Sequence, residues 1–241
     1  MRLRLRPPLF GTIGHWALGS VCLGVLAHPA TAAAPPACVY ADQPTPVSAG
    51  DQWRFALVDT RFRLPEEFVP ADLVSVRQAG LADDRTLRAP AVADLAELLS
   101  AAGRAGVLFE LQSAYRSFEY QEQVFSGWVR AQGREQALLT SARPGHSEHQ
   151  LGTAIDLRTR GGPAPWGLAD WAETPEGTWL QANAWRFGFV MSYPRGREAV
   201  TCYAYEPWHY RWFGRDAAAE IRSSGLTARE WLWRLVEEGA D

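Results

Sequence analysis

The sequence predicts an α+β fold in a single domain, with a small central antiparallel sheet flanked by helices. Amphipathic helical patterns occur early and late in the chain, and apolar strand-like runs lie between them. The 241 residues are 47% hydrophobic and 21% charged, a globular composition sufficient for one hydrophobic core. This composition argues against disorder and coiled coil, and the sequence shows neither an internal repeat nor a second domain.

The N-terminus has the layout of a secretory signal. Three arginines within the first six residues precede a mostly apolar run over residues 9–27, which leads into the small residues of HPATAAAPPA. We therefore expect residues 1–34 to be a signal peptide, cleaved near Ala32 to Ala34. An uncleaved anchor is the alternative, but His15 and four glycines interrupt the run, so we expect no stable membrane span after cleavage.

A lead-in, a helix and a strand are predicted to follow the signal. Residues 35–52 are rich in Pro, Ala and small polar residues, which predicts an extended lead-in, and the domain then occupies residues 53–241. Residues 91–102 predict a helix with its apolar side chains on one face, and the sequence GRAG ends it. The apolar run from Val107 predicts a strand whose end delivers Arg116.

Capping signals place the later helices. Ser117 is the predicted N-cap of a helix that has two glutamates near its positive end. Thr174 followed by Pro175 predicts another helix, which extends to about Phe187. Thr227 opens the capping box of the last helix. Strands are predicted over residues 153–157, in FGFVMSYP (187–194) and in YAYEPWHYRWF (203–213).

Cysteine usage predicts one disulfide. Cys22 lies in the predicted signal, so the mature chain keeps Cys38 and Cys202, an even pair in an exported protein. Their bond would close a loop of roughly 160 residues and stabilise the fold by about 4 kcal/mol on the chain-entropy model. Two unrelated buried thiols are the alternative.

The charge pattern excludes nucleic acid as a partner. All 24 basic residues are Arg, and the formal net charge is -3. Outside the predicted signal the sequence contains no basic block, which a phosphate-binding surface would require.

Three histidines remain for chemistry in the mature chain. His149 lies seven residues before Asp156 in PGHSEHQLGTAIDL, and His209 lies in EPWH. A catalytic zinc site takes three protein ligands of these types and leaves a position open for water. The spacing alone leaves the alternatives open, because no HExxH helix is present. In the alternative without a metal site, His146 and Glu148 are solvated loop residues, and His149 and His209 are ordinary packed or hydrogen-bonded residues.

Three separated segments carry a family resemblance. SEHQLGTAID fits the pattern S-x-H-x-x-G-x-A-x-D, YEPWHYRW fits E-x-x-H with its flanking residues, and SAYRSFEYQ precedes both. Over about residues 50–215 the chain resembles the VanY-type D-alanyl-D-alanine carboxypeptidases and the related L,D-carboxypeptidases of bacterial cell walls. It departs from the commonest form at Ala114, where Gly is usual, and at Cys202 just ahead of the second motif.

The resemblance implies a zinc site on the sheet and a set of catalytic residues. It implies that His149, Asp156 and His209 bind Zn²⁺. Glu206 would be the general base for metal-activated water, and Arg116 would stabilise the oxyanion of the scissile carbonyl.

The resemblance also implies peptide contacts. Ser147 and Gln121 match positions that contact the substrate in related enzymes. His146 and Glu148 match no such role, and we expect them to be bystanders.

The function implied is that of an exported zinc carboxypeptidase that removes the C-terminal D-alanine from peptidoglycan stem peptides, with D,D or L,D specificity. We expect a monomer located in the periplasm, at the cell envelope or outside the cell. The alternatives are a peptidoglycan endopeptidase of the same zinc architecture and a non-catalytic zinc-stabilised wall-binding module. An intact Glu206 argues against the binding module, because a structural zinc site is usually closed by four ligands and needs no base.

Overall fold

The central feature of the structure is a four-stranded antiparallel sheet. The computed structural model describes residues 34–46 and 51–239, so the predicted signal peptide lies outside the described residues except for Ala34. The sheet order is β5-β6-β8-β7, and each neighbouring pair is antiparallel. The strands are β5 Phe109–Ser113, β6 Ala154–Thr159, β7 Phe189–Met191 and β8 His209–Trp212. The predicted fold class and central sheet are confirmed.

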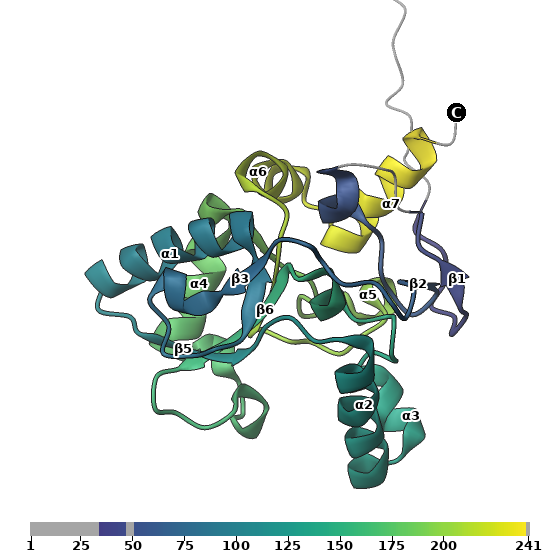
Figure 1. The fold of residues 1–241 in the computed structure, drawn as a ribbon, viewed down its shortest axis with the longest axis horizontal. Helices are drawn as coiled ribbons and strands as arrows, with labels where there is room; N and C mark the ends of the chain where they lie inside the picture. Colours follow the sequence, from purple (N-terminus) through teal and green to yellow (C-terminus); the bar gives the residue numbers. More distant parts are fainter. Residues whose placement is uncertain (1–33, 47–50, 240–241) are drawn as a thin grey trace, which may run out of the picture. The chain divides into compact units, whose positions relative to one another are not determined.

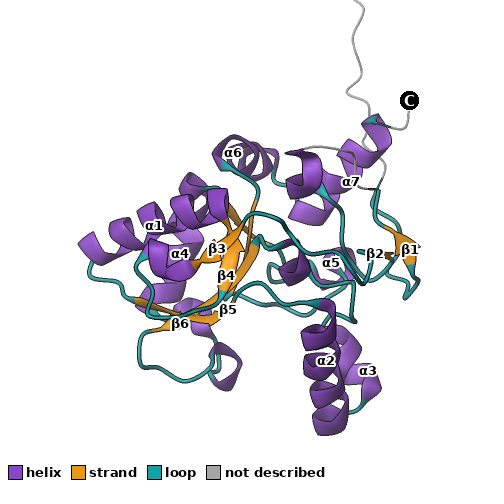
Figure 2. Cartoon of the chain, in the orientation of Figure 1, coloured by secondary structure: helices purple, strands orange, loops and turns teal. Residues whose placement is uncertain are grey.

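Helices flank this sheet (Figures 1 and 2). The α-helices are α1 Ala89–Arg104, α2 Phe118–Gln132, α3 Arg134–Thr140, α4 Pro175–Asn183, α5 Glu198–Thr201, α6 Arg215–Ser224 and α7 Ala228–Glu238. The 3₁₀ helices are η1 Asp51–Phe55, η2 Val76–Ala79, η3 Glu148–Leu151, η4 Pro165–Gly167, η5 Trp171–Glu173 and η6 Ala184–Phe187. Two short strand pairs complete the fold: parallel β1 Gln43–Pro44 with β2 Phe62–Arg63, and antiparallel β3 Leu73–Ser75 with β4 Thr86–Arg88.

The core lies on one face of the sheet. Side chains alternate along a strand, and on β6 Ile155 and Leu157 join the main hydrophobic cluster. On β8, Tyr210 and Trp212 join the same cluster. Apolar residues of α1 and α4 pack against this face. The alternate residues of both strands therefore point to the opposite face.

Capping residues set the helix ends as the sequence predicts. The Ser117 side chain accepts a hydrogen bond from the Tyr120 amide at the start of α2. The Thr174 side chain accepts from the Gly177 amide at the start of α4, where Pro175 occupies the first turn. Thr227 and Glu230 form both bonds of the capping box of α7. These interactions satisfy amide groups that have no partner within the helix.

Two element predictions need correction. The strand expected over residues 203–213 is only β8, because residues 203–208 form a loop and turn in which Pro207 has no amide to donate to a ladder. The helix expected to reach Phe187 is α4 only as far as Asn183, and 3₁₀ helix η6 continues it. The sequence prediction did not include α3 or α6.

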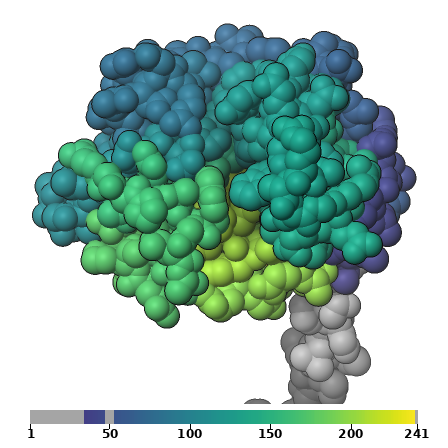
Figure 3. Space-filling model, turned by 90° about the horizontal axis from the view of Figure 1, so that it is seen from below, coloured from purple at the N-terminus to yellow at the C-terminus, as the bar shows by residue number. Residues whose placement is uncertain are grey.

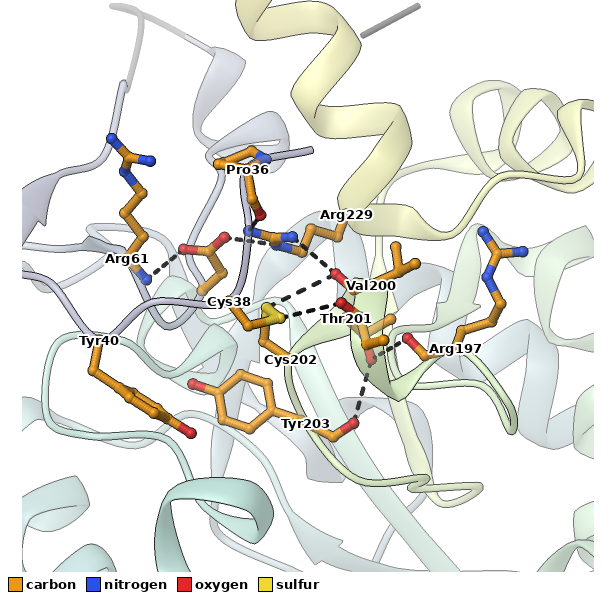
Figure 4. Close-up of a disulfide and its surroundings, with 12 residues drawn as sticks. Pro36, Cys38, Tyr40, Arg61, Arg197, Val200, Thr201, Cys202, Tyr203 and Arg229 are labelled. Atoms are coloured by element: carbon orange, nitrogen blue, oxygen red, sulfur yellow. Dashed lines mark hydrogen bonds and ion pairs between the residues drawn. A yellow bond between two sulfur atoms is a disulfide. The ribbon is translucent and has the colours of Figure 1, made fainter. Parts of the chain in front are cut away.

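The predicted disulfide joins Cys38 to Cys202, which are separated by 164 residues (Figure 4). It attaches the lead-in to the segment that follows α5. Arg229 of α7 contacts the same region, because its guanidinium donates to the carbonyls of Pro36 and Val200. The lead-in is thus fixed to the domain by a covalent bond and by the partly buried hydrogen bond from Arg229 to Pro36.

Residues 34–46 and 51–239 contain no helix with the length and apolarity needed to cross a membrane.

Candidate metal centre

Two candidate ligands lie side by side on the sheet, on the face opposite the core. Asp156 on β6 and His209 on β8 are paired in register, and both side chains are buried. Their sequence positions alternate with Ile155, Leu157 and Tyr210, which face the core. Strand alternation puts both side chains on this face, and the register between β6 and β8 brings them together although they are 53 residues apart in sequence.

His149 reaches the same point from 3₁₀ helix η3. The helix ends at Gly152, whose φ of +71° is in the left-handed region that favours glycine. His149 Nδ1 donates to the Ala114 carbonyl at 2.7 Å, which leaves Nε2 as the unprotonated nitrogen. Nε2 is buried without a hydrogen-bond partner and lies 3.3 Å from Asp156 Oδ2.

His209 faces the candidate metal position with Nδ1, whereas His149 faces it with Nε2. His209 Nδ1 lies 2.8 Å from Asp156 Oδ1, and its Nε2 lies 2.9 Å from Glu148 Oε2. Burial disfavours the imidazolium, but the hydrogen bonds to Asp156 and Glu148 outweigh it and raise the pKa of His209 to about 10. This protonation describes the metal-free protein, in which a proton occupies the space between the ring and the Asp156 carboxylate.

These three residues fit a metal ion. Each offers one ligand atom, and the atoms lie within 4.8 Å of one another. Two imidazoles and one carboxylate are a donor set typical of catalytic zinc. Burial, followed by the neighbouring Arg116 charge, lowers the pKa of His149 to about 4, so its ring is neutral at pH 7, as a ligand must be. The partnerless Nε2 atom is the strongest sign that a ligand is meant to lie here.

Glu206 lies in the loop that leads into β8. The His209 amide donates to the Glu206 carbonyl at 3.1 Å, so a tight turn fixes the carboxylate relative to the candidate ligand. Burial is the main cause that raises the pKa of Glu206 to about 7, and the nearby Asp156 charge adds to it. A carboxylate with this pKa is suited to accept and return a proton near neutral pH.

Arg116 follows β5 at the other side of the site. Its amide donates to the His149 carbonyl at 3.3 Å, and its side chain lines the same cavity as His149 and Glu206. Burial lowers the pKa of Arg116, and the charges of Asp156 and Glu206 oppose that shift. Its buried Nε atom has no hydrogen-bond partner. Within the described residues it forms no ion pair with either glutamate of α2, so its guanidinium is available to a ligand.

The cavity that contains these residues has a volume of about 840 Å³. It is hollowed into the face of the domain between the teal α2–α3 segment and the green segment that follows β6 (Figure 3). Cavities of this size hold ligands larger than a single amino acid. The charged or ionisable side chains in its wall include Glu148, His149, Asp156, Glu206 and His209.

The two predicted peptide contacts lie at different depths. Ser147 is buried and lines the cavity at the start of residues 147–156, the segment that carries His149 and Asp156 and is called the metal arm below. Gln121 is fully buried behind the wall, where its Nε2 donates to the Ala142 carbonyl at 2.6 Å. Its Oε1 has no partner. Both remain predictions as substrate contacts, and the structure places only Ser147 on the cavity surface.

Glu148 and His146 differ from the expectation of solvated loop residues. Glu148 is buried and holds His209 through Oε2, while Arg211 at 3.0 Å and Ser192 at 2.6 Å hold Glu148. The prediction that Glu148 is a bystander is wrong. His146 does stand apart from the metal triad, but it is buried and bonds the lead-in residue Asp42 at 2.9 Å. No sequence signal at either position revealed these partners, because they are all distant in sequence.

A small antiparallel sheet that presents a His–Asp–His triad beside the carboxylate of Glu206 and the guanidinium of Arg116 is an arrangement typical of metal-dependent peptidases. The sequence model of the VanY D-alanyl-D-alanine carboxypeptidase family matches residues 84–215. The chain belongs to this family, and it is an enzyme of the carboxypeptidase type.

Sequence comparison with individual proteins supports this membership. The chain is 35% identical over 184 residues to YodJ of Bacillus subtilis (strain 168), a match that covers 75% of this chain and 67% of YodJ. It is 28% identical over 196 residues to a D-alanyl-D-alanine carboxypeptidase of Enterococcus faecium, covering 78% of this chain and 60% of that enzyme.

Solved structures show the same fold. The LdcB LD-carboxypeptidase matches with a TM-score of 0.66 and 29% identity, over 81% of this chain and 98% of that one. A variant of the VanY D,D-pentapeptidase from a VanB-type resistance cassette matches with a TM-score of 0.64 and 31% identity, over 75% of this chain and 99% of that one. That structure is a complex with Zn(II).

Proposed function

We propose that this chain is an exported zinc carboxypeptidase that removes the C-terminal D-alanine from peptidoglycan stem peptides, with residues 53–241 as the catalytic domain. The observation that carries the proposal is the convergence of three candidate metal ligands with Glu206 and Arg116 in one cavity. The names of the similar proteins support the substrate class, because they include both D,D- and L,D-carboxypeptidases. The predicted signal at residues 1–34 supports export to a compartment where this substrate occurs.

His149 Nε2, an Asp156 oxygen and His209 Nδ1 would hold the zinc ion. When bound, zinc supplies a Lewis acid that makes water nucleophilic at neutral pH and polarises the peptide carbonyl. For this, His209 must give up the proton that Nδ1 holds in the metal-free protein, and the Nε2 hydrogen bond to Glu148 keeps the ring oriented.

Glu206 and Arg116 would carry the remaining chemistry. Glu206 accepts a proton from the attacking water and returns it to the leaving amine of D-alanine. The Arg116 guanidinium stays charged and offers donors in a rigid fork, which suits the oxyanion that develops on the carbonyl. Ser147 would contact the peptide, and its place in the cavity wall supports this role.

The direct test is hydrolysis of defined stem peptides. The mature protein is incubated with tetra- and pentapeptide stems of both stereochemistries at the cleavage site, and products are identified by mass spectrometry. We expect loss of one D-alanine, abolition by chelation and recovery with added zinc. Activity that survives exhaustive chelation would reject the metal, and internal fragments in place of free D-alanine would establish the endopeptidase alternative.

The role of Glu206 has its own test. We expect Glu206→Gln to keep near-stoichiometric zinc, because Glu206 is not among the three ligands, and to lower kcat by roughly 10²–10⁴-fold. Metal content by elemental analysis and turnover on the same peptide are measured together. A variant that loses zinc would show that Glu206 acts as a ligand, and one with wild-type kcat would show that it is not the base.

A further inference from the structure

One helix supplies a long wall of the cavity beyond the metal centre. Tyr120, Val124, Trp128 and Gln132 of α2 all line the cavity and recur every four residues, so they form one stripe along the helix. The N-terminus of α2 lies next to the metal arm, because the preceding Arg116 amide bonds the His149 carbonyl. At 1.5 Å per residue, Trp128 lies about 12 Å further along the helix than Tyr120.

Three tryptophans connect this wall to the metal ligand His209. Trp208 directly precedes His209 in the sequence. The Trp208 ring lies 5.9 Å from the ring of Trp166 in η4. The Trp166 ring lies 6.1 Å from that of Trp128 on α2. All three line the cavity. The aromatic row therefore crosses the hollow from the segment before β8 to α2.

Trp166 is the exposed member of the row. Both of its aromatic contacts are edge-to-face, at 69° and 81°, so in neither contact do two ring faces stack on each other. The residue is 47% exposed, which is unusual for a large apolar side chain inside a cavity that already contains the reacting groups. An indole held in this way offers a flat apolar surface to a ligand.

The side chains around this outer end carry no formal charge. In the described part of the chain, the cavity residues contributed by α2, α3 and η4 are Tyr120, Val124, Trp128, Gln132, Thr140 and Trp166. Gln132 Nε2 donates to the Thr140 hydroxyl, and together they form a neutral polar edge beside the indoles. The charged or ionisable side chains of the wall lie elsewhere: Arg85 just before β4, Arg116 after β5, Glu148 and His149 on η3, Asp156 on β6, Glu206 before β8 and His209 at the start of β8.

We infer that this outer end, formed by Trp128 and Trp166 with Gln132, binds the N-acetylated amino-sugar to which the stem peptide is attached. A sugar ring has an apolar C–H face that fits an indole, and hydroxyl and acetamido groups that fit neutral polar side chains. A cationic or anionic group would favour a charged partner, and this end offers none. The inference rests on the proposed function and names the part of the substrate recognised away from the bond that is cut.

The dimensions agree with this assignment. Four residues separate the sugar from the scissile bond of a pentapeptide stem, and four extended residues span about 14 Å. The stripe on α2 covers a similar distance, since Gln132 lies about 18 Å along the helix from Tyr120. A stem held at the metal centre by its C-terminus would therefore bring the sugar to Trp128 and Trp166.

The test compares two substrates in matched variants. One is a free pentapeptide stem, and the other is the same stem on an N-acetylglucosamine–N-acetylmuramic acid disaccharide. We expect wild type to have a kcat/KM roughly tenfold higher for the disaccharide-linked stem, about the size of one or two aromatic contacts. Trp166→Ala should remove this preference and leave the free peptide within about twofold of wild type. Trp166→Phe should retain part of it.

Leu168→Ala is the control for changes in the same loop, because Leu168 is exposed but does not line the cavity. It should keep the preference for the disaccharide. Equal cleavage of both substrates by wild type, or an equal loss on both in Trp166→Ala, would overturn the inference. So would a loss that depends on a Lys rather than an Ala at the third stem position, because that would identify a cage for an ammonium group.

A binding measurement separates this inference from the proposed function. Calorimetric titration with the disaccharide-tripeptide, which has no D-alanine to remove, reports the sugar site without catalysis. Weaker binding by Trp166→Ala than by wild type and Leu168→Ala supports the site even if neither substrate is cleaved. Identical binding by all three proteins overturns it, whatever the activity.

Discussion

Glu148 holds His209 by the ring nitrogen that points away from the candidate metal. Its second oxygen pairs with Arg211, which is fully buried and also donates to the Ala56 carbonyl at 2.8 Å. The charge of Arg211 offsets the burial of the carboxylate, and with the bond to His209 it lowers the pKa of Glu148 to about 2. The ring of His209 is thus oriented by a buried, charged network and by Ser192.

Removing the charge of Glu148 should therefore weaken metal binding. We expect Glu148→Gln to lower zinc affinity by about 10–100-fold, the usual cost of changing a residue that orients a ligand. Competition with a chromophoric chelator measures the affinity directly. Ser192→Ala is the control, since it removes one hydrogen bond and keeps the carboxylate. Unchanged affinity in a folded Glu148→Gln protein would show that His209 needs no such support.

Arg116 should not be replaceable by lysine. Arg116→Lys keeps the charge but loses the fork of donors, and its side chain must reach the carbonyl from the position that follows β5. We expect kcat to fall by roughly 10²-fold, as for the loss of one oxyanion donor, while zinc content stays the same. Steady-state kinetics on the best stem peptide measures the effect. An unchanged kcat would make Arg116 a structural residue.

The disulfide acts at the scale of elements, because it joins the lead-in to the end of α5. Cys202 has a φ of +71°, the left-handed conformation that glycine adopts more easily, and it closes α5. The lead-in also holds Arg143, which donates to Asp42 at 2.8 Å and to the Ala41 carbonyl at 2.6 Å. The covalent bond therefore reinforces contacts between segments about 100 residues apart.

Cys38→Ser should lower the free energy of unfolding by about 4 kcal/mol, because the closed loop is long and the unfolded chain regains its freedom. Chemical denaturation of the mature protein measures this change. Reduction of wild type should give the same midpoint as the variant, and reductant should not affect the variant further. If complete reduction left the denaturation midpoint of the wild type unchanged, the disulfide would not stabilise the fold.

At the scale of the whole molecule, the active site makes the stability of the metal-free protein depend on pH. The pKa of Glu206 is about 7 in the folded state, above its ordinary value of 4.5, chiefly because burial disfavours the charged carboxylate. The folded state then binds more protons than the unfolded state between these two pH values. The contribution of Glu206 to stability therefore falls as pH rises from about 4.5 to 7 and stays low above that.

Glu206→Gln should abolish this contribution. We expect the metal-free variant to gain about 3 kcal/mol in unfolding free energy relative to metal-free wild type on going from pH 4 to pH 8. Denaturation at the two pH values, with chelator present throughout, measures the difference. Both proteins retain the other ionisable groups of the site, so their pH dependence largely cancels in this comparison. A difference that is the same at both pH values would show that Glu206 has an ordinary pKa.

Local sequence predicted α1, α2, α4 and α7 among the seven α-helices of the described residues, and motifs that resemble a known family named the candidate ligands. The N-caps Ser117, Thr174 and Thr227 were predicted correctly, because each cap side chain bonds an amide only three residues further along the chain. The alternation of polar and apolar residues around Asp156 and His209 likewise follows from the period of a strand. The ligand set and the disulfide pair are brought together as predicted.

Tertiary structure alone decided which neighbours these residues have. The register between β6 and β8 faces Asp156 with His209, and the same fold turns Glu148 inward to Arg211 and Ser192. The stripe on α2 meets Trp166 only because the chain after β6 folds back across the hollow. Contacts between residues 38 to 63 positions apart depend on the packing of whole elements, whereas caps and alternation depend on a few adjacent residues. That difference in range is why caps and strand alternation could be predicted from the local sequence. The ligands were named only because their motifs resemble those of a known family, and their supports and the outer wall of the cavity were not predicted.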